Sequence, residues 1–290
     1  MQKITPCLWY NDQTEDALNR LISYFPNSKI ETIQRYPDGL MPGMDGKIIT
    51  AIFELAGQSF MALDGGPTFN FTPAISFFIN GDSVAEIDRL WEQLSVEGAA
   101  LMPIGDYGFS EKFGWLNDRD GVSWQLNVGA RPQKITPYLL FVGEQHGKAE
   151  EAIQFYTSIF ADSSIEYITH HTGEMGEAGT VLTSLFRLNG QEFMAMDSNL
   201  EHNFTFTEAT SFYVECDTQA EVDHFWNALS AVPDAEQCGW LKDKYGISWQ
   251  IVPRVLGELL SDPDAEKANR VMDAMLQMKK IEIDGLMQAV

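Results

Sequence analysis

The side chains that most often carry chemistry are few in this sequence and unevenly distributed. All five histidines lie in its second half, at His146, His170, His171, His202 and His224. The three cysteines, Cys7, Cys216 and Cys238, are odd in number and show no Cys-x-x-Cys spacing. This pattern argues against a disulfide framework and against a thiolate zinc site. Chemistry based on imidazole is therefore expected only in the second half of the chain.

Two aspartates occupy matching positions at the ends of apolar runs. Asp64 ends the run Phe-Met-Ala-Leu-Asp, and Asp197 ends Phe-Met-Ala-Met-Asp. Either carboxylate could act as a general base if it is buried. An aspartate at a strand end, as before Gly65 and Gly66, is also typical of a turn. Both interpretations stay open at this stage.

The matching aspartates belong to an internal repeat. Lys3-Ile4-Thr5-Pro6 recurs as Lys134-Ile135-Thr136-Pro137, and the segment from Gly114 to Gln125 recurs from Gly239 to Gln250. The second copy is about ten residues shorter between Ser230 and Trp240. Self-similarity of this kind indicates a tandem duplication. We therefore expect one domain over residues 1–130, a second over 131–257, and a tail over 258–290.

Each repeat must place these residues on two successive strand–helix–strand–strand–strand units. In the first repeat, apolar periodicity predicts strands over 4–10, 28–36, 47–56, 58–64 and 74–80, and helices over 12–25 and 83–96. A turn-rich segment covers 37–43, and a long loop over 99–113 precedes the final short strands. In the tail, Val271, Met272, Met275, Leu276 and Met278 predict a single helix from Asp262 to about Met287.

The charge balance restricts the class of partner. The chain has 19 basic and 42 acidic side chains, a formal net charge of −23, and 44% hydrophobic residues. A strongly negative field repels phosphate backbones and anionic lipids, so we expect neither a nucleic acid nor a membrane partner. No stretch approaches the roughly 18 apolar residues that span a bilayer, and the first residues lack an apolar signal core. These features predict a cytoplasmic protein.

The repeated motifs resemble a known family. Each copy begins with Thr-Pro-x-Leu, at Thr5 and Thr136, and ends with Asp-x-x-Gly-x-Ser-Trp-Gln, from Asp118 and from Asp243. This combination resembles the PhnB-like branch of the vicinal oxygen chelate superfamily, whose domain is often called 3-demethylubiquinone-9 3-methyltransferase. The superfamily also includes glyoxalase I, extradiol dioxygenases, and the fosfomycin and bleomycin resistance proteins. The resemblance covers residues 3–128 and 134–253.

The resemblance implies an α+β fold of two tandem glyoxalase-like domains. Each domain would be a pair of βαβββ units that form a cup-shaped mixed sheet, with helices on the convex face and a pocket on the concave face, and a C-terminal helix would follow. It does not imply a reaction. The residues do not support the methyltransferase name. A Rossmann-type methyltransferase that binds S-adenosylmethionine needs a glycine-rich turn after its first strand, and residues 1–38 contain no glycine.

Catalytic members of the superfamily hold a divalent metal with His, Glu or Gln side chains. The corresponding positions here are Thr5, Ala62, Ala74 and Gln125 in the first repeat and Thr136, Ala195, Ala209 and Gln250 in the second. Only the glutamines could ligate a metal. We therefore predict no catalytic metal and no cofactor.

Strand alternation, applied to these positions, indicates which residues line the cups. The predicted ligand-pocket residues are Thr5, Trp9, Asp64, Ser76, Ser123, Gln125, Thr136, Tyr138, Asp197, His202, Ser211, Tyr213, Ser248 and Gln250. The same register assigns Phe60 and Ala62 to the cup. It places the apolar residues Ile75, Phe77, Ile79, Trp124 and Leu126 under the helices. The alternative to a ligand pocket is that bulky side chains fill the cups and no ligand binds.

The sequence favours a metal-free small-molecule-binding protein whose repeats imitate the two subunits of a homodimer, an arrangement compatible with a monomer. The ligand's identity is open. One alternative is an enzyme of the same fold, of lyase, transferase or dioxygenase type, with a non-standard site in the second domain near His202. Another is a structural or interaction module that uses the methionine-rich tail. If ligand binding is selective, we expect the second cup to carry it, through Gln250, Ser211, Asp197 and His202.

Overall fold

The computed structural model describes residues 2–36, 46–174 and 176–290, so the predicted turn at 37–43 lies outside the described residues. The chain divides into two compact units, Pro6–Thr210 and Met1–Thr5 with Ser211–Val290, which are described separately. The boundaries fall within the strands β1 and β13 rather than between the repeats. We call the four βαβββ units modules one to four, in chain order.

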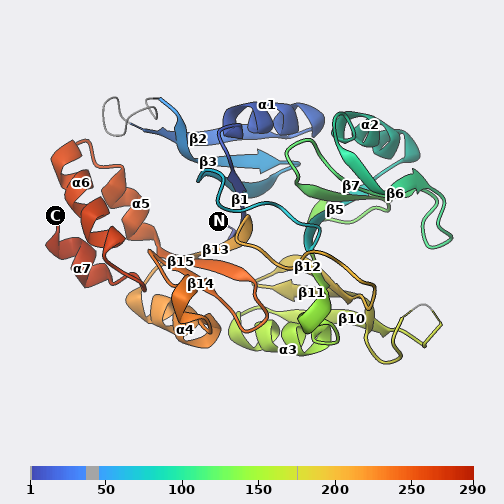
Figure 1. The fold of residues 1–290 in the computed structure, drawn as a ribbon. Coiled ribbons are helices and arrows are strands. Elements are labelled where there is room, and N and C mark those ends of the chain that lie inside the picture. Colours follow the sequence, from blue (N-terminus) through green and yellow to red (C-terminus); the bar gives the residue numbers. More distant parts are fainter. Residues whose placement is uncertain (1, 37–45, 175) are drawn as a thin grey trace. The chain divides into compact units, whose positions relative to one another are not determined.

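The unit Pro6–Thr210 contains modules one to three. Its elements are β1 (Ile4–Tyr10), α1 (Thr14–Tyr24), β2 (Lys29–Arg35), β3 (Ile48–Leu55), β4 (Gln58–Asp64), β5 (Ile75–Gly81), α2 (Val84–Leu94), β6 (Ala99–Gly105), β7 (Phe113–Asn117), β8 (Ser123–Val128), β9 (Ile135–Phe141), a 3-10 turn (Gly143–Gln145), α3 (Ala149–Ile159), β10 (Ser164–His170), β11 (Val181–Leu188) and β12 (Gln191–Asp197). Figure 1 shows α1 along β2 and β3, and α3 beside β10 and β11. Strand β6 lies where the sequence predicted a long loop.

An eight-stranded mixed sheet dominates this unit, in the order β10-β11-β12-β9-β5-β8-β7-β6. Strands β5 to β8 come from the first repeat and β9 to β12 from the second. The two halves meet at the antiparallel pair β5 and β9, where Ser76 opposes Tyr138 and Phe78 opposes Thr136. The glyoxalase-like α+β fold class is confirmed. Module two, however, shares its sheet with module three rather than with module one.

Backbone hydrogen bonds at equivalent places in the two repeats show the same pairing of one repeat with the other. The backbone N–H of Asn80 donates to the carbonyl of Lys134 at 2.9 Å, and that of Glu215 donates to Lys3 at 3.3 Å. The N–H of Leu140 donates to Ala74 at 2.8 Å, and the N–H of Trp9 donates to Ala209 at 2.8 Å. Each bond lies within one unit. In both repeats the first strand therefore bonds to the start of the other repeat's second half.

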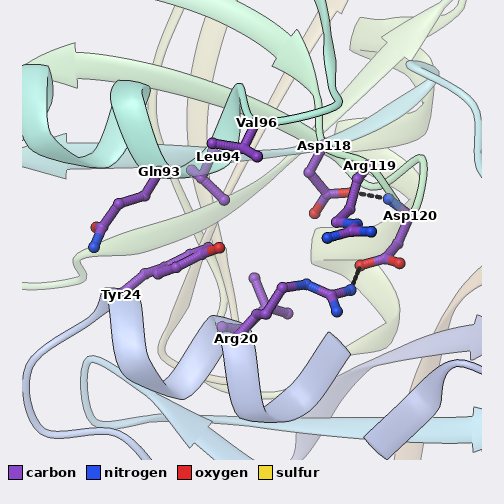
Figure 2. Close-up of a pocket in the computed structure, with 9 residues that line it drawn as sticks. Arg20, Tyr24, Gln93, Leu94, Val96, Asp118, Arg119 and Asp120 are labelled. Atoms are coloured by element: carbon purple, nitrogen blue, oxygen red, sulfur yellow. Dashed lines mark hydrogen bonds and ion pairs between the residues drawn. The ribbon is translucent and has the colours of Figure 1, made fainter. Parts of the chain in front are cut away.

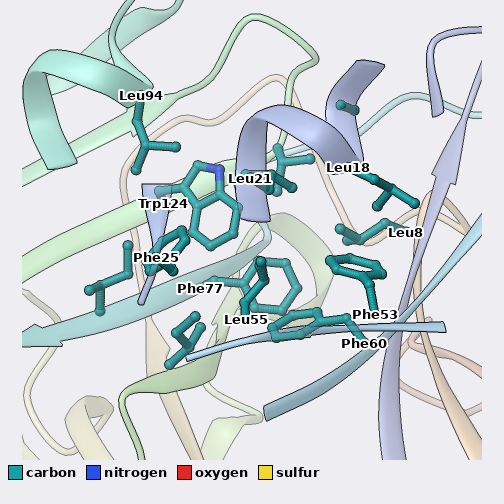
Figure 3. Packing of buried hydrophobic residues seen from close by; sticks show 14 of the residues in the cluster. Leu8, Leu18, Leu21, Phe25, Phe53, Leu55, Phe60, Phe77, Leu94 and Trp124 are labelled. Atoms are coloured by element: carbon teal, nitrogen blue, oxygen red, sulfur yellow. The ribbon is translucent and has the colours of Figure 1, made fainter. Parts of the chain in front are cut away.

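The core of the first repeat lies beneath α1 and α2. Phe60 packs edge-on against Phe77 with 5.3 Å between ring centroids, and Phe77 contacts Trp124 at 5.4 Å (Figure 3). Leu8, Ile79 and Leu126 belong to the same buried cluster. The predicted register of β5 and β8 is confirmed, because Phe77, Ile79, Trp124 and Leu126 lie in this core as expected.

The predicted register of β4 and β12 is wrong. Phe60 and Ala62 lie in the helix-side core instead of in the cup. On β12, Phe193 stacks on Phe186, and Met194 points to the other face. Both faces of these strands are apolar, so hydrophobic alternation carries no signal for their orientation.

The second unit combines module four with the tail. Its elements are β13 (Thr210–Cys216), α4 (Gln219–Leu229), a 3-10 turn (Pro233–Ala235), β14 (Trp240–Lys242), β15 (Ser248–Pro253), α5 (Arg254–Leu260), α6 (Ala265–Leu276) and α7 (Ile283–Gln288). β15 lies between the parallel β13 and the antiparallel β14. Among the described residues, no helix is long and apolar enough to cross a membrane.

The tail forms separate helices rather than the single predicted one. After α6, the carbonyls of Met278 and Lys279 accept the N–H groups of Cys238 and Gly239 at 2.8 Å each, which ends the helical pattern. The tail packs on its own unit: Val271, Ile281 and Leu286 are fully buried in one cluster with Val252 and Leu256. The predicted apolar stripe is therefore docked on the protein.

Candidate functional site

The strongest candidate site is the face of the eight-stranded sheet opposite α2 and α3, which we call the inner face. It carries a second apolar cluster, separate from the helix-side core. The cluster consists of Phe78, Phe113, Tyr138, Leu185 and Met194, with the partly buried Met102, Trp115 and Met196 against it. Methionine side chains adapt to irregular partners, so this face combines aromatic walls with deformable ones.

Polar side chains run through the inner face. The Gln125 amide donates from Nε2 to Oγ of Ser76 at 2.8 Å, and both residues are buried. The indole of Trp115 donates to Oγ of Ser123 at 2.8 Å. Strand pairing explains these contacts, because Ser76 opposes Ser123 and Phe78 opposes Gln125. The expectation that Ser76, Ser123 and Gln125 lie together is supported by this geometry.

The tyrosine of this face is held as a neutral phenol. The hydroxyl of Tyr138 donates to Oγ1 of Thr183 at 3.2 Å, and burial raises its pKa to about 12. It is therefore a hydrogen-bonding group over the whole physiological pH range.

Several buried oxygens of the inner face lack a hydrogen-bond partner in the described chain. They include Oγ1 of Thr136, a residue with 0% exposure, Oε2 of Glu192, a residue with 5% exposure, and Oδ1 of Asn80. Glu192 lies two residues before Met194 and so faces the same side of β12. Thr136 was predicted from the sequence, but Glu192 was not, because the predicted register of β12 was the opposite one. The repeated motif Gln-x-Phe-Met-Ala, with Ser59 in the other copy, could have singled out this acid.

An aromatic loop borders the cluster. The rings of Tyr107 and Phe109 lie 5.7 Å and 5.1 Å from that of Phe113. Phe109 is 69% exposed, which is unusual for so large an apolar side chain. The loop between β6 and β7 thus presents apolar rings beside the inner face. The shorter second repeat has no strand corresponding to β6 among its described residues.

Module four, in the second unit, has a corresponding face with a matching glutamine–serine pair. Nε2 of Gln250 donates to Oγ of Ser211 at 3.0 Å, which repeats the Gln125–Ser76 pair. Oγ of Ser248 is buried without a hydrogen-bond partner in the described residues. Tyr213 packs against the cluster that anchors the tail. Thr5, the other candidate in this unit, is partly buried.

The two aspartates predicted as candidate bases accept hydrogen bonds from nearby donors of the chain. Oδ1 of Asp64 accepts the N–H of Asp12 at 2.9 Å, and Oδ2 accepts the hydroxyl of Thr14, the first residue of α1, at 2.9 Å. Asp197 accepts the N–H groups of Gly147 at 2.7 Å, Val181 at 2.9 Å and Ala149 at 3.3 Å. Both carboxylates therefore brace the start of a helix, and neither faces the inner face.

Trp9 and His202 also have local partners. The Trp9 indole donates to the carbonyl of Gly66 at 2.8 Å. Its ring lies over Gly65, where a Cβ would come within 2.1 Å of ring carbon. Nε2 of His202 lies 2.9 Å from Oγ of Ser198, and the imidazole packs on Phe204. Burial lowers the His202 pKa, so its neutral form is favoured.

Two further hollows occur on the helix side of this unit. One, of about 10 Å³, is lined by Arg20, Tyr24, Asp118 and Asp120 among others (Figure 2). It has room for about one water molecule. The other, of about 240 Å³, has charged walls that pair with each other: Arg35 with Glu15 at 2.7 Å and Lys47 with Asp12 at 2.6 Å. Among the described residues, the charged groups that line these hollows are already in ion pairs or hydrogen bonds.

The inner face does not fit the metal that the superfamily resemblance implies. Thr136 and Gln125 occupy inherited ligand positions, but the Gln125 amide is turned to donate to Ser76, and Glu192 is already paired with Arg187 at 3.2 Å. No three His, Cys, Asp or Glu side chains converge on one point in the described chain. An imidazole–carboxylate donor set of the superfamily type is thus not assembled from these residues.

Two solved structures are similar in sequence to part of this chain. The PhnB protein from Bacillus cereus, called a 3-demethylubiquinone-9 3-methyltransferase, is 46% identical over 44% of this chain and 100% of its own, with a TM-score of 0.42. Protein PA1353 from Pseudomonas aeruginosa is 27% identical over 44% of this chain and 98% of its own, with a TM-score of 0.40.

Glyoxalase I from Zea mays shows the same fold over more of the chain. It is 12% identical over 90% of this chain and 98% of its own, with a TM-score of 0.56. No curated protein sequence matches. The family model described as 3-demethylubiquinone-9 3-methyltransferase matches residues 2–127 and again residues 133–252. The chain therefore belongs to this PhnB-like family of the glyoxalase fold, and contains two tandem copies of its domain.

Proposed function

We propose that the protein binds a small, partly apolar organic molecule on the inner face. The observation that carries the proposal is a set of buried polar groups among aromatic and methionine side chains: the Gln125–Ser76 pair and the unpartnered hydroxyl of Thr136. Ligand sites typically combine apolar walls with a few fixed polar groups. A face that only filled a core would have no need of an unpartnered hydroxyl, whose burial costs stability.

This proposal moves the favoured site from the second cup to the sheet shared by modules two and three. Asp197 and His202, expected there as polar groups, are bound to local backbone and to Ser198. The other two, Gln250 and Ser211, lie on module four, where the neighbouring Tyr213 packs against the tail. The tail's apolar stripe packs on its own unit. This favours a role of the tail in folding over a role in binding a partner.

Ligand-observed NMR on the full chain tests the proposal. The probes are 2-phenylethylamine, 2-phenylethanol and phenylacetate, which share one apolar body and differ in charge. We expect at least one of them to bind the wild type. Gln125→Ala should weaken that binding, whereas the matched Gln250→Ala should leave it unchanged. Loss only in Gln250→Ala would move the site to module four, and no binding by any probe would contradict the proposal.

A further inference from the structure

Glu192 is a buried acid that the protein itself satisfies only in part. Its Oε1 accepts Nη2 of Arg187 at 3.2 Å, while Oε2 has no hydrogen-bond partner in the described residues. Only 5% of the residue is exposed, so solvent does not compensate for the missing partner. A buried carboxylate oxygen left without a donor is destabilising. A ligand that supplies a donor at this point would remove that cost.

Another unpartnered oxygen, that of Thr136, lies on the adjacent strand of the same face. β12 and β9 pair in parallel with Met194 beside Tyr138, so the residues two positions earlier, Glu192 and Thr136, are also neighbours on the inner face. Thr136 in turn opposes Phe78 on β5. The sheet thus brings together a carboxylate oxygen, a hydroxyl and an aromatic ring, none of which the chain joins by a hydrogen bond.

The charges around this point favour a cationic donor. Arg187 pairs with Glu192 and lies 3.7 Å from Glu166, so these three side chains carry one net negative charge. Nη2 of Arg131, a further cation of this unit, donates to the hydroxyl of Tyr167 at 3.3 Å, and its Nη1 is buried without a hydrogen-bond partner; no ion pair joins Arg131 to Glu192 in the described residues. Aromatic faces such as Phe78 and Tyr138 attract cations, and the net charge of −23 draws them toward the protein.

We infer that the ligand of the inner face carries an ammonium group, which donates to Glu192 Oε2 and Thr136 Oγ1 while its apolar body lies against Phe78, Tyr138 and Met194. This inference rests on the proposed function and names the ligand class. The acid is particular to this sheet, because the other repeat has Ser59 at the matching position. The ligand class is therefore a small aromatic or aliphatic amine in its protonated form.

The test compares charge on the ligand with charge on the protein. We expect 2-phenylethylamine to bind the full chain at pH 7 about tenfold more tightly than 2-phenylethanol, and phenylacetate to bind least. Glu192→Gln, which keeps the size of the side chain, should abolish the preference for the amine. Glu166→Gln removes an exposed carboxylate beside the same arginine and should reduce the preference without abolishing it.

The outcomes separate this inference from the proposed function. If 2-phenylethanol binds as well as the amine and Gln125→Ala weakens both, the inner face binds ligands and the ammonium inference is wrong. An amine preference that survives Glu192→Gln also overturns it. If no probe binds, the proposed function itself fails. A circular dichroism melt of each variant establishes that a loss of binding does not reflect unfolding.

Discussion

At the residue scale, the repeated motif Asp-x-x-Gly-x-Ser-Trp-Gln combines a structural part with a functional one. Oδ2 of Asp118 accepts the indole N–H of Trp124 at 2.8 Å, and Oδ1 accepts the N–H of Val122 at 2.9 Å. Asp243 binds Trp249 and Ile247 in the same way. The aspartate fixes the turn and the buried tryptophan, and the tryptophan's neighbour, the glutamine, points to the opposite face. One strand thus secures the core and carries the glutamine that we propose contacts the ligand.

The Asp118 carboxyl should give a pH-dependent signal. Burial raises its pKa from 3.8 to about 6. The folded state then holds a proton more tightly than the unfolded state, so the protein loses roughly 3 kcal/mol of stability from this group as the pH rises from 4 to 6. We expect the indole N–H resonance of Trp124 to shift with a midpoint near pH 6. The same shift in Asp118→Asn would show that another group titrates.

Thr136 should cost stability in the free protein. Thr136→Val replaces an unpartnered buried hydroxyl by a methyl group of similar shape, and we expect the free energy of unfolding to stay unchanged or to rise by about 1 kcal/mol. Ser184 is the contrasting case, because its hydroxyl donates to and accepts from the backbone of Ala195. Ser184→Ala should therefore lower stability by about 1 kcal/mol. Denaturant titration measures both, and a clear loss in Thr136→Val would mean that its hydroxyl has a partner.

Asp197 should act through stability. Asp197→Ala leaves two backbone N–H groups at the start of α3 and one at the start of β11 without their acceptor, and we expect a loss of roughly 2–4 kcal/mol. The control is Asp106→Ala, which removes a single exposed contact to the N–H of Gly108 and should change the melting temperature little. Equal melting temperatures for Asp197→Ala and wild type would return this carboxylate to the list of candidate bases.

At the scale of elements, the sequence predicted strands well wherever one face is apolar and the other is not. On β8, Trp124 and Leu126 alternate with Ser123 and Gln125, so both the strand and its register follow from the pattern. On β12, Phe193 and Met194 are both apolar, and only tertiary packing decides that Met194 and Glu192 face inward. The missing site residue and the misplaced aspartates are consequences of that one ambiguity.

The tail shows a similar limit. Its apolar positions predicted a helix that docks, and the docking is observed, but the break after Leu276 depends on hydrogen bonds to Cys238 and Gly239. Those partners are about 40 residues away in sequence. Local periodicity contains no information about such a contact.

Removing the tail should destabilise its unit. Truncation after Ser261 exposes Val252 and Leu256, which Val271, Ile281 and Leu286 now cover, and we expect a melting temperature lower by several degrees together with binding of a hydrophobic dye. Val271→Asp should reproduce the effect by placing an unpaired charge in this cluster. Leu276→Ser, at a position 49% exposed, is the control and should melt like wild type. A truncated chain that is equally stable would show that the docked tail contributes nothing to folding.

At the scale of the whole molecule, the exchange of strands between repeats could not be predicted from the sequence. Both repeats carry the same edge residues, so Lys3 and Lys134 are equally suited to bond with either repeat's second half. Their side chains are equivalent as well: Lys134 pairs with Glu86 at 2.9 Å, and Lys3 pairs with Glu221 at 3.1 Å. In the structure, a short connection from β8 leads the chain into β9, which pairs antiparallel with β5.

This architecture predicts that the connection between the repeats is dispensable once the protein has folded. A protease site inserted between Gly129 and Ala130 would cut the chain while leaving the β5–β9 pairing in place, together with the reciprocal bonds of Thr72 to Thr205 and of Thr207 to Asn70, at 2.7 and 2.8 Å. We expect the two fragments to co-elute in size-exclusion chromatography and to separate only in denaturant. An insertion of equal length without the protease site controls for the added residues. Fragments that separate under native conditions would mean that the repeats are independent domains. Fragments that stay together would show that the contacts between the repeats, the β5–β9 pair among them, hold the fold without the connection.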